Sequence, residues 1–219
     1  MSEGNGGAAA SGRDEAMALL ADLPRLHRWG GEEQVGGMNR AIGERMVAEL
    51  ERYPSPRVVE TGAGASTLLF CCMEPAELTS IAPNAELEER IRGEAAARGI
   101  DLGALTYLCE RSEVALPRLA AAGGQIDVAL IDGSHNWPSV FVDFCYANMM
   151  MASGATLFLD DTQLYSVSQL FLLLQEQEEF EHVGLDGKLA TFRKRSDHSF
   201  LPEWNMEPFI ERNSPVQES

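Results

Sequence analysis

The stretch that decides the fold is Val58-Val59-Glu60-Thr61-Gly62-Ala63-Gly64-Ala65-Ser66-Thr67. Two β-branched residues lead into a turn of small residues, and small polar residues follow the turn. Such a turn lets backbone N–H groups approach a ligand closely, and the start of the following helix favours an anionic group. The stretch therefore predicts a strand, a ligand-binding loop and a helix, in that order.

The spacing of the glycines argues against a dinucleotide-binding loop. That loop requires G-x-G-x-x-G, and Thr67 stands at the third glycine position. Glu60 adds a constraint, because a carboxylate at the end of a buried strand is costly unless it meets a cation or hydrogen-bond donors. A strand-to-helix turn capped by Ser66, without any ligand, is the alternative interpretation.

Apolar runs and helical stretches alternate after this loop. Apolar runs without polar alternation indicate strands buried on both faces, and the alternation predicts a parallel sheet covered by helices. We therefore expect an α/β, doubly wound, mostly parallel sheet. Its strands are expected at 57–61, 78–82, 105–109, 126–131 and 155–160.

The two ends of the chain differ from this pattern. Residues 181–185 and 188–193 flank Asp186-Gly187, which predicts a C-terminal antiparallel hairpin. Near the N-terminus, helices are expected at 14–23 and 38–52, joined by a glycine-rich connection.

Charge and hydropathy exclude several classes of partner. The 219 residues include 34 acidic and 17 basic side chains, a formal net charge of −17. This charge repels nucleic acids and anionic lipid surfaces. The one tight basic cluster, Arg193, Lys194 and Arg195, is expected to be a solvated strand end. No apolar run approaches the roughly 18 residues of a membrane span, so we expect no membrane contact and a cytoplasmic location.

Four cysteines lack the C-x-x-C spacing of a metal or redox site and are expected to be reduced and buried: Cys71, Cys72, Cys109 and Cys145. The segment 169–174 includes the run Leu170-Phe171-Leu172-Leu173-Leu174, which is apolar around the helix. It is assigned either to the core or to an interface in a homo-oligomer.

Two apolar strands end in aspartate. One ends in Asp132, with His135 three residues later, and the other ends in Asp160 and Asp161. Because neighbouring parallel strands end at the same crevice, these carboxylates should converge and repel one another unless a cation lies between them. Mg²⁺ or another divalent cation would suit them and could bind a substrate hydroxyl. His135 could then act as general base; its alternative is a capping or core histidine.

These patterns resemble a known enzyme class. E-x-G-x-G-x-S resembles motif I of class I S-adenosylmethionine-dependent methyltransferases, and I-D-G-S-H with a later D-D resembles their metal-dependent branch that O-methylates macrolide sugars. The resemblance implies that Asp132, Asp160 and Asp161 bind the metal and that His135 and Asp132 are catalytic. It implies a set of cofactor-binding residues: Glu60, Gly62, Ala63, Gly64, Ser66, Thr67, Asn84, Ser112 and Asp132.

Some positions depart from that family. The second strand lacks the acidic residue that usually binds the ribose, and Asn84 could make only part of that contact. Ser112 and Glu113 match the adenine region loosely. Trp137 is expected either to wall the pocket or to pack in the core. Asp143 is expected to be a solvated or supporting carboxylate on a helix.

The sequence thus predicts a disordered leader (1–12), an N-terminal helical segment (13–56), a methyltransferase domain (57–195) and a tail (196–219). The expected function is O-methylation of a small-molecule hydroxyl, on a natural product or sugar, with S-adenosylmethionine as cofactor. Two alternatives stay open: metal-independent methylation of nitrogen or carboxyl groups, and a non-methylating relative that only binds the cofactor.

Overall fold

The computed structural model describes residues 12–29, 31–198 and 208–213. All but the last residue of the expected leader, and most of the expected tail, lie outside the described residues. Within the described part of the chain, no helix is long and apolar enough to cross a membrane.

The centre of the fold is a seven-stranded sheet with the order β5-β4-β3-β6-β7-β9-β8. The first five strands in this order are parallel, and β9 and β8 are antiparallel. The strands are β3 (Arg57–Thr61), β4 (Glu77–Ile81), β5 (Leu105–Leu108), β6 (Ile126–Ile131), β7 (Met151–Leu159), β8 (Phe180–Asp186) and β9 (Leu189–Lys194). The predicted doubly wound, mostly parallel α/β fold with a C-terminal antiparallel hairpin is confirmed.

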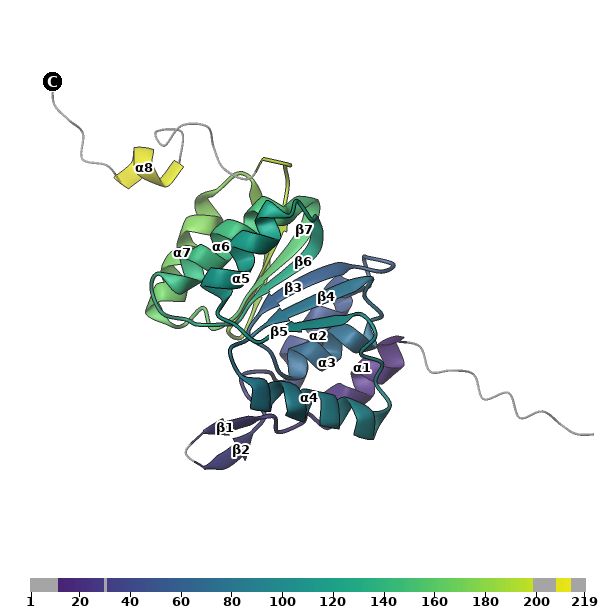
Figure 1. Ribbon diagram of the computed structural model, residues 1–219. Helices are drawn as coiled ribbons and strands as arrows, with labels where there is room; N and C mark the ends of the chain where they lie inside the picture. Colours follow the sequence, from purple (N-terminus) through teal and green to yellow (C-terminus); the bar gives the residue numbers. More distant parts are fainter. Residues whose placement is uncertain (1–11, 30, 199–207, 214–219) are drawn as a thin grey trace, which may run out of the picture.

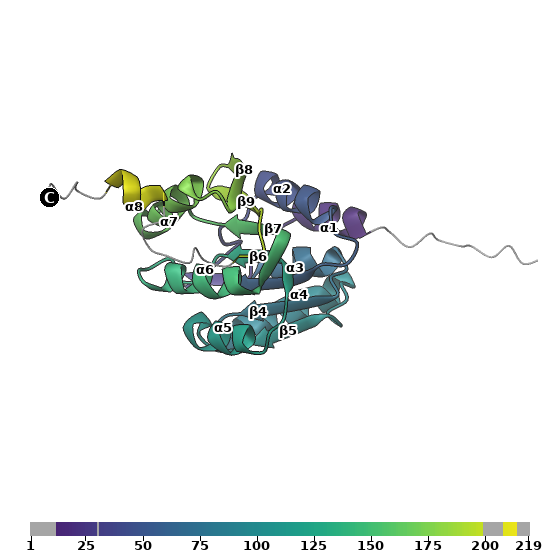
Figure 2. The same ribbon diagram turned by 90° about the horizontal axis from the view of Figure 1, so that it is seen from above.

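Helices cover both faces of the sheet (Figures 1 and 2). On one face lie α1 (Gly12–Ala21), α2 (Arg40–Leu50), α3 (Ala65–Cys72) and α4 (Ala85–Arg98). On the other lie α5 (Ser112–Ala121), α6 (Ser139–Met150) and α7 (Tyr165–Glu176). The short α8 (Pro208–Asn213) contacts α7 through an ion pair between Arg212 and Glu176. Side chains of the central strands alternate between the two cores, as strand geometry requires.

The register of the central strands positions the site. Thr61 pairs with Ile131, and Ile131 pairs with Leu159. The next backbone N–H groups continue this register, since Asp132 N donates to Thr61 O and Asp160 N donates to Ile131 O. Strand order also reverses beside β3, because β4 lies on one side and β6 on the other. Ligands of open α/β sheets bind at such a switch point.

Two local features differ from the sequence-based expectation. The expected glycine-rich connection contains a small hairpin, β1 (His27–Trp29) and β2 (Glu32–Gln34). Its strands are too short and too polar to show a period-two pattern. In the C-terminal hairpin Asp186 pairs with Leu189, so the turn residues are Gly187 and Lys188 rather than Asp186 and Gly187.

The basic cluster on β9 is not a solvated strand end. Lys194 is only 1% exposed, and its Nζ donates to the carbonyl oxygens of Asn148 and Met151. Arg193 is half-buried and forms an ion pair with the buried Glu49 of α2, whereas Arg195 is exposed. These contacts join the N-terminal helices and α6 to the sheet.

The apolar and cysteine predictions are partly right. Leu170 and Leu174 belong to the core, while Leu172 is exposed, so an interface role for this run stays a prediction.

The four cysteines are free; Cys71 and Cys72 are buried, Cys145 is half-buried, and the expectation of burial is wrong for the exposed Cys109.

We expect Leu157→Ala to lower the free energy of unfolding by about 3 kcal/mol, because Leu157 is fully buried in β7 and its truncation leaves a cavity. Leu172→Ala, at a half-exposed position of α7, is the matched control and should cost less than about 1 kcal/mol. Urea denaturation followed by circular dichroism measures both. Equal losses in the two variants would contradict the assignment of Leu157 to the core.

Candidate active site

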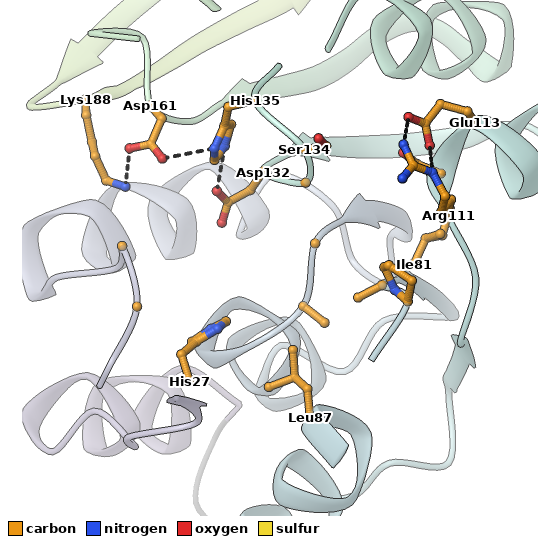
Figure 3. Close-up of a pocket in the computed structure, with 18 residues that line it drawn as sticks. His27, Ile81, Leu87, Arg111, Glu113, Asp132, Ser134, His135, Asp161 and Lys188 are labelled. Atoms are coloured by element: carbon orange, nitrogen blue, oxygen red, sulfur yellow. Dashed lines mark hydrogen bonds and ion pairs between the residues drawn. The ribbon is translucent and has the colours of Figure 1, made fainter. Parts of the chain in front are cut away.

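A cavity of about 630 Å³ opens at the carboxyl ends of β3, β4 and β6. The glycine loop contributes Gly62 and Ala63 to its wall, and the end of β4 contributes Ile81. Figure 3 shows Asp132, His135, Asp161 and Lys188 on one side and Arg111 with Glu113 on another. The cavity therefore lies where the strand order predicts a ligand site.

The glycine loop passes very close to the loop that follows β6. Gly62 has φ +87°, and an added Cβ would overlap the carbonyl oxygen of Asp132. Its N–H donates to Ile81 O at 2.9 Å. Gly64 is the N-cap of α3, and an added Cβ there would meet the ring of His27. The loop thus brings the N-terminus of α3 to the cavity edge, where backbone N–H groups suit an anionic group.

Glu60 lies beneath this loop and does not line the cavity. It is fully buried, and it accepts hydrogen bonds from Ser66 Oγ at 2.7 Å, from Thr67 and from Ser80 Oγ. Burial raises the pKa of Glu60 to about 7, although the three hydroxyl donors lower it. Glu60, Ser66 and Thr67, all predicted to bind cofactor, therefore contact one another and hold the loop in place from below.

Two further predicted cofactor residues have different positions. The side chain of Asn84 caps α4 by accepting from Leu87 N at 3.0 Å, and it does not line the cavity. Ser112 does line the cavity, together with its neighbours Arg111 and Glu113, which form an ion pair at 2.7 Å. Arg111 and Ser139 lower the pKa of Glu113 to about 2, so this carboxylate is charged.

His135 lies between two aspartates. Its Nε2 is 3.4 Å from Asp132 Oδ1, and its Nδ1 is 3.4 Å from Asp161 Oδ2. Asp132 raises the pKa of His135, while burial raises the pKa of Asp132 to about 7. The carbonyl oxygen of His135 accepts from the hydroxyl of Ser166 at the start of α7, which fixes this loop. The pair can accept and hold a proton.

The second acidic group is bound by a lysine. Lys188 Nζ donates to Asp160 Oδ2 at 2.8 Å and to Asp161 Oδ1 at 2.6 Å. Burial alone would lower the pKa of Lys188, but the two carboxylates outweigh it and raise the pKa. Asp161 has φ +58°, a left-handed conformation that aspartate tolerates better than most residues, and its side chain lines the cavity.

The arrangement bears directly on the expected metal site. The sequence predicts Asp132, Asp160 and Asp161 as ligands, but two of these carboxylates converge on Lys188. A different set, Asp132, His135 and Asp161, offers ligand atoms within 4.8 Å of one another. The predicted three-carboxylate set therefore does not fit a divalent ion in this arrangement, because the Lys188 ammonium group lies where the ion would bind both Asp160 and Asp161.

Besides Lys188, two lining residues with ionisable side chains were missed from the sequence. His27 comes from the small N-terminal hairpin and faces His135 across the cavity (Figure 3). Burial, and then the charge of Arg90, lower the pKa of His27. Arg111, the N-cap of α5, lies on the other side. Their types were visible in the sequence, but no motif connected these positions to the loop.

Two other expectations need correction. Asp143 on α6 is fully buried, so the solvated alternative is wrong and the supporting one stays open; burial raises its pKa to about 6. Trp137 is 76% exposed, so it is not part of the core, and it is not among the residues that line the cavity.

Comparison with known protein families gives a match over part of the chain. The family described as "Methyltransferase domain" matches residues 59–162, which include the glycine loop and both aspartate-bearing strand ends. No protein of curated function matches the chain in sequence.

Several solved structures share the fold. The O-methyltransferase TomG from Streptomyces achromogenes, involved in tomaymycin synthesis and solved with SAM, is 18% identical; the match covers 87% of this chain and 91% of that one, with a TM-score of 0.59. A methyltransferase from Geobacter sulfurreducens is 16% identical, with coverages of 69% and 77% and a TM-score of 0.55. Precorrin-6y C5,15-methyltransferase from Geobacter metallireducens is 12% identical, with coverages of 72% and 90% and a TM-score of 0.56.

Gly62→Ala should lower the free energy of unfolding by about 2 kcal/mol or more, because the new Cβ overlaps backbone and the φ is left-handed. Gly93→Ala is the control, because Gly93 lies at an exposed position of α4 where an added Cβ meets nothing within 4 Å. This substitution should raise the free energy of unfolding by up to about 1 kcal/mol. Thermal and urea denaturation compare them. A Gly62→Ala protein as stable as the wild type would refute the close approach.

Glu60→Gln should change how stability depends on pH. Since the folded-state pKa of Glu60 is about 7 against an ordinary 4.5, the folded state binds this proton more tightly, and wild-type stability falls as pH rises from 4.5 to 7. The amide does not titrate, so we expect the wild type to lose up to about 3 kcal/mol relative to Glu60→Gln across this window. Urea titrations at pH 5 and pH 8 test it, and parallel pH profiles would contradict it.

Proposed function

We propose that this chain, an S-adenosylmethionine-dependent methyltransferase, transfers the methyl group to a hydroxyl oxygen of a small molecule. The observation that carries the proposal is the His135–Asp132 pair at the cavity wall, next to the glycine loop. A hydroxyl must lose a proton as its oxygen is methylated, and this pair offers a place for that proton.

The cavity suits the cofactor. The carboxylate group of S-adenosylmethionine would suit the N–H groups at the start of α3, and its ammonium group would suit the acidic side chain of Asp132. Arg111 and Glu113 lie on the side of the cavity opposite Lys188 (Figure 3), and Ser112, between them in sequence, also lines the cavity; these polar donors and acceptors suit the nucleoside. Glu60, Ser66 and Thr67 support the loop from beneath, so their contribution to binding is indirect.

The protein's part in the reaction is positioning and proton transfer. When bound, S-adenosylmethionine supplies a methyl group on a sulfonium sulfur. His135 accepts the hydroxyl proton, and Asp132 stabilises the resulting imidazolium. Asp161, on the other ring nitrogen, orients the imidazole. Holding the acceptor oxygen in line with the methyl group provides much of the rate enhancement.

The acceptor is proposed to be a small hydroxylated molecule, such as a natural product or a sugar. A net charge of −17 disfavours nucleic acids. The similar fold of TomG, an O-methyltransferase of tomaymycin synthesis, supports this class of acceptor. A divalent cation, which the sequence resemblance implies, stays a prediction that competes with Lys188 for the same carboxylates.

A panel of acceptors tests the reaction class. The protein is incubated with S-adenosylmethionine and with matched phenols, sugars, amines and carboxylic acids, and release of S-adenosylhomocysteine is measured. Mass spectrometry then locates the methyl group. O-methylation of hydroxylated acceptors supports the proposal, whereas methylation confined to amines or carboxylates contradicts it.

His135→Ala should lower kcat by about a hundredfold or more while the cofactor Kd stays within about twofold, because the imidazole acts on the acceptor proton. His198→Ala, at an exposed position outside the cavity, is the control and should keep full turnover. Product formation and calorimetric titration with S-adenosylmethionine separate the two effects. Unchanged kcat in His135→Ala would remove the histidine from the mechanism.

A further inference from the structure

We propose that the ammonium group of Lys188 is the built-in cation of the Asp160–Asp161 pair, and that it takes the place of a divalent metal ion. The consequence for catalysis, methyl transfer without a metal, rests on the proposed function. The proposal that Lys188 occupies the space between Asp160 and Asp161 does not rest on that function, and it can be tested separately.

The first argument is the position of Lys188 Nζ. It is 2.8 Å from Asp160 Oδ2 and 2.6 Å from Asp161 Oδ1. A divalent ion bound by both carboxylates would need distances of about 2.0 to 2.6 Å to the same two oxygens. The ion and the ammonium group would therefore overlap, and only one of them can be present.

The second argument is that the backbone holds Lys188 at this point. Its carbonyl oxygen accepts two hydrogen bonds from Thr162, from N at 3.0 Å and from Oγ1 at 2.9 Å. Thr162 directly follows Asp161, so the lysine is attached to the loop that carries the acidic pair. Gly37 covers the ammonium group from the N-terminal segment, and an added Cβ there would overlap Nζ. These contacts oppose movement of Lys188 away from the carboxylates.

The third argument is charge. Asp132, Asp160 and Asp161 bring up to three negative charges to one side of the cavity. Lys188 balances one. Before transfer the sulfonium of the bound cofactor balances a second, and after transfer, when the sulfonium has become a neutral thioether, the proton on His135 takes its place. A dication added to these groups would leave the loaded site positive and would oppose binding of the sulfonium.

The choice of residue fits this role. The chain has 17 basic side chains, and only Lys188 and Lys194 among them are lysines. Lysine carries a compact point charge that can approach two carboxylates in the manner of a metal ion, whereas arginine presents a planar fork.

Lys188 acts on the reaction through Asp161, which faces His135, and is therefore a positioning residue.

Manganese binding tests the proposal without any methyl acceptor. Wild type, Lys188→Met and Lys188→Arg are titrated with Mn²⁺ by calorimetry and by electron paramagnetic resonance. We expect wild type and Lys188→Arg to bind Mn²⁺ weakly, and Lys188→Met to bind at least about tenfold more tightly because the acidic pair is vacated. The double variant Lys188→Met with Asp160→Asn should lose this gain.

Each outcome decides the question. Tight Mn²⁺ binding by the wild type, no gain in Lys188→Met, or a gain that survives Asp160→Asn overturns the proposal. If Lys188→Met is unfolded without metal, added Mg²⁺ should refold it, and failure to do so also counts against the idea.

The catalytic consequence has its own measurement. Wild type treated with EDTA and dialysed should keep its rate of S-adenosylhomocysteine formation with an accepted hydroxyl substrate; loss of that rate, restored by Mg²⁺, overturns metal-free transfer. Absence of any turnover would instead challenge the proposed function, and the Mn²⁺ result would stand independently.

Discussion

The structure depends on how negative charge is stabilised where parallel strands end. The register of β3, β6 and β7 brings Asp132 and Asp160 to the same edge of the sheet, and neither can move away without breaking strand pairing. Unpaired carboxylates in this partly buried place would repel one another and lose hydration. Their neighbours therefore have to supply positive charge or donors, and the chain supplies both: His135 beside Asp132 and Lys188 beside Asp160.

Glu60 faces the same problem one strand away and is stabilised differently. Three hydroxyl groups from α3 and β4 donate to it, which satisfies its oxygens without a cation. These contacts hold the glycine loop from below, and the loop is held further by two of its own N–H groups, since Gly62 N donates to Ile81 O and Gly64 N donates to Thr67 Oγ1. The two acidic groups thus differ in position: Glu60 is enclosed beneath the glycine loop, whereas Asp132 lines the cavity beside His135.

The sequence predicts what local pattern determines. The central strands have the expected positions because buried apolar runs bounded by turns are a local signal, and Asp132 with His135 forms part of one such segment. Partners from distant segments have no such signal. Lys188 lies in a turn displaced by one residue from the predicted one, and His27 comes from a hairpin with no apolar alternation. Asn84 was assigned to the ribose by analogy, but its position before a helix favours capping.

The boundary of the family match shows why details of the reaction do not transfer with the fold. Residues 59–162 contain the glycine loop and the aspartates, whereas His27 and Lys188 lie outside that range. The family match therefore includes Asp160 and Asp161 but not the ammonium group that contacts both of them. Because function depends on the complete site, Lys188 of the β8–β9 turn has to be considered together with the two aspartates that it contacts.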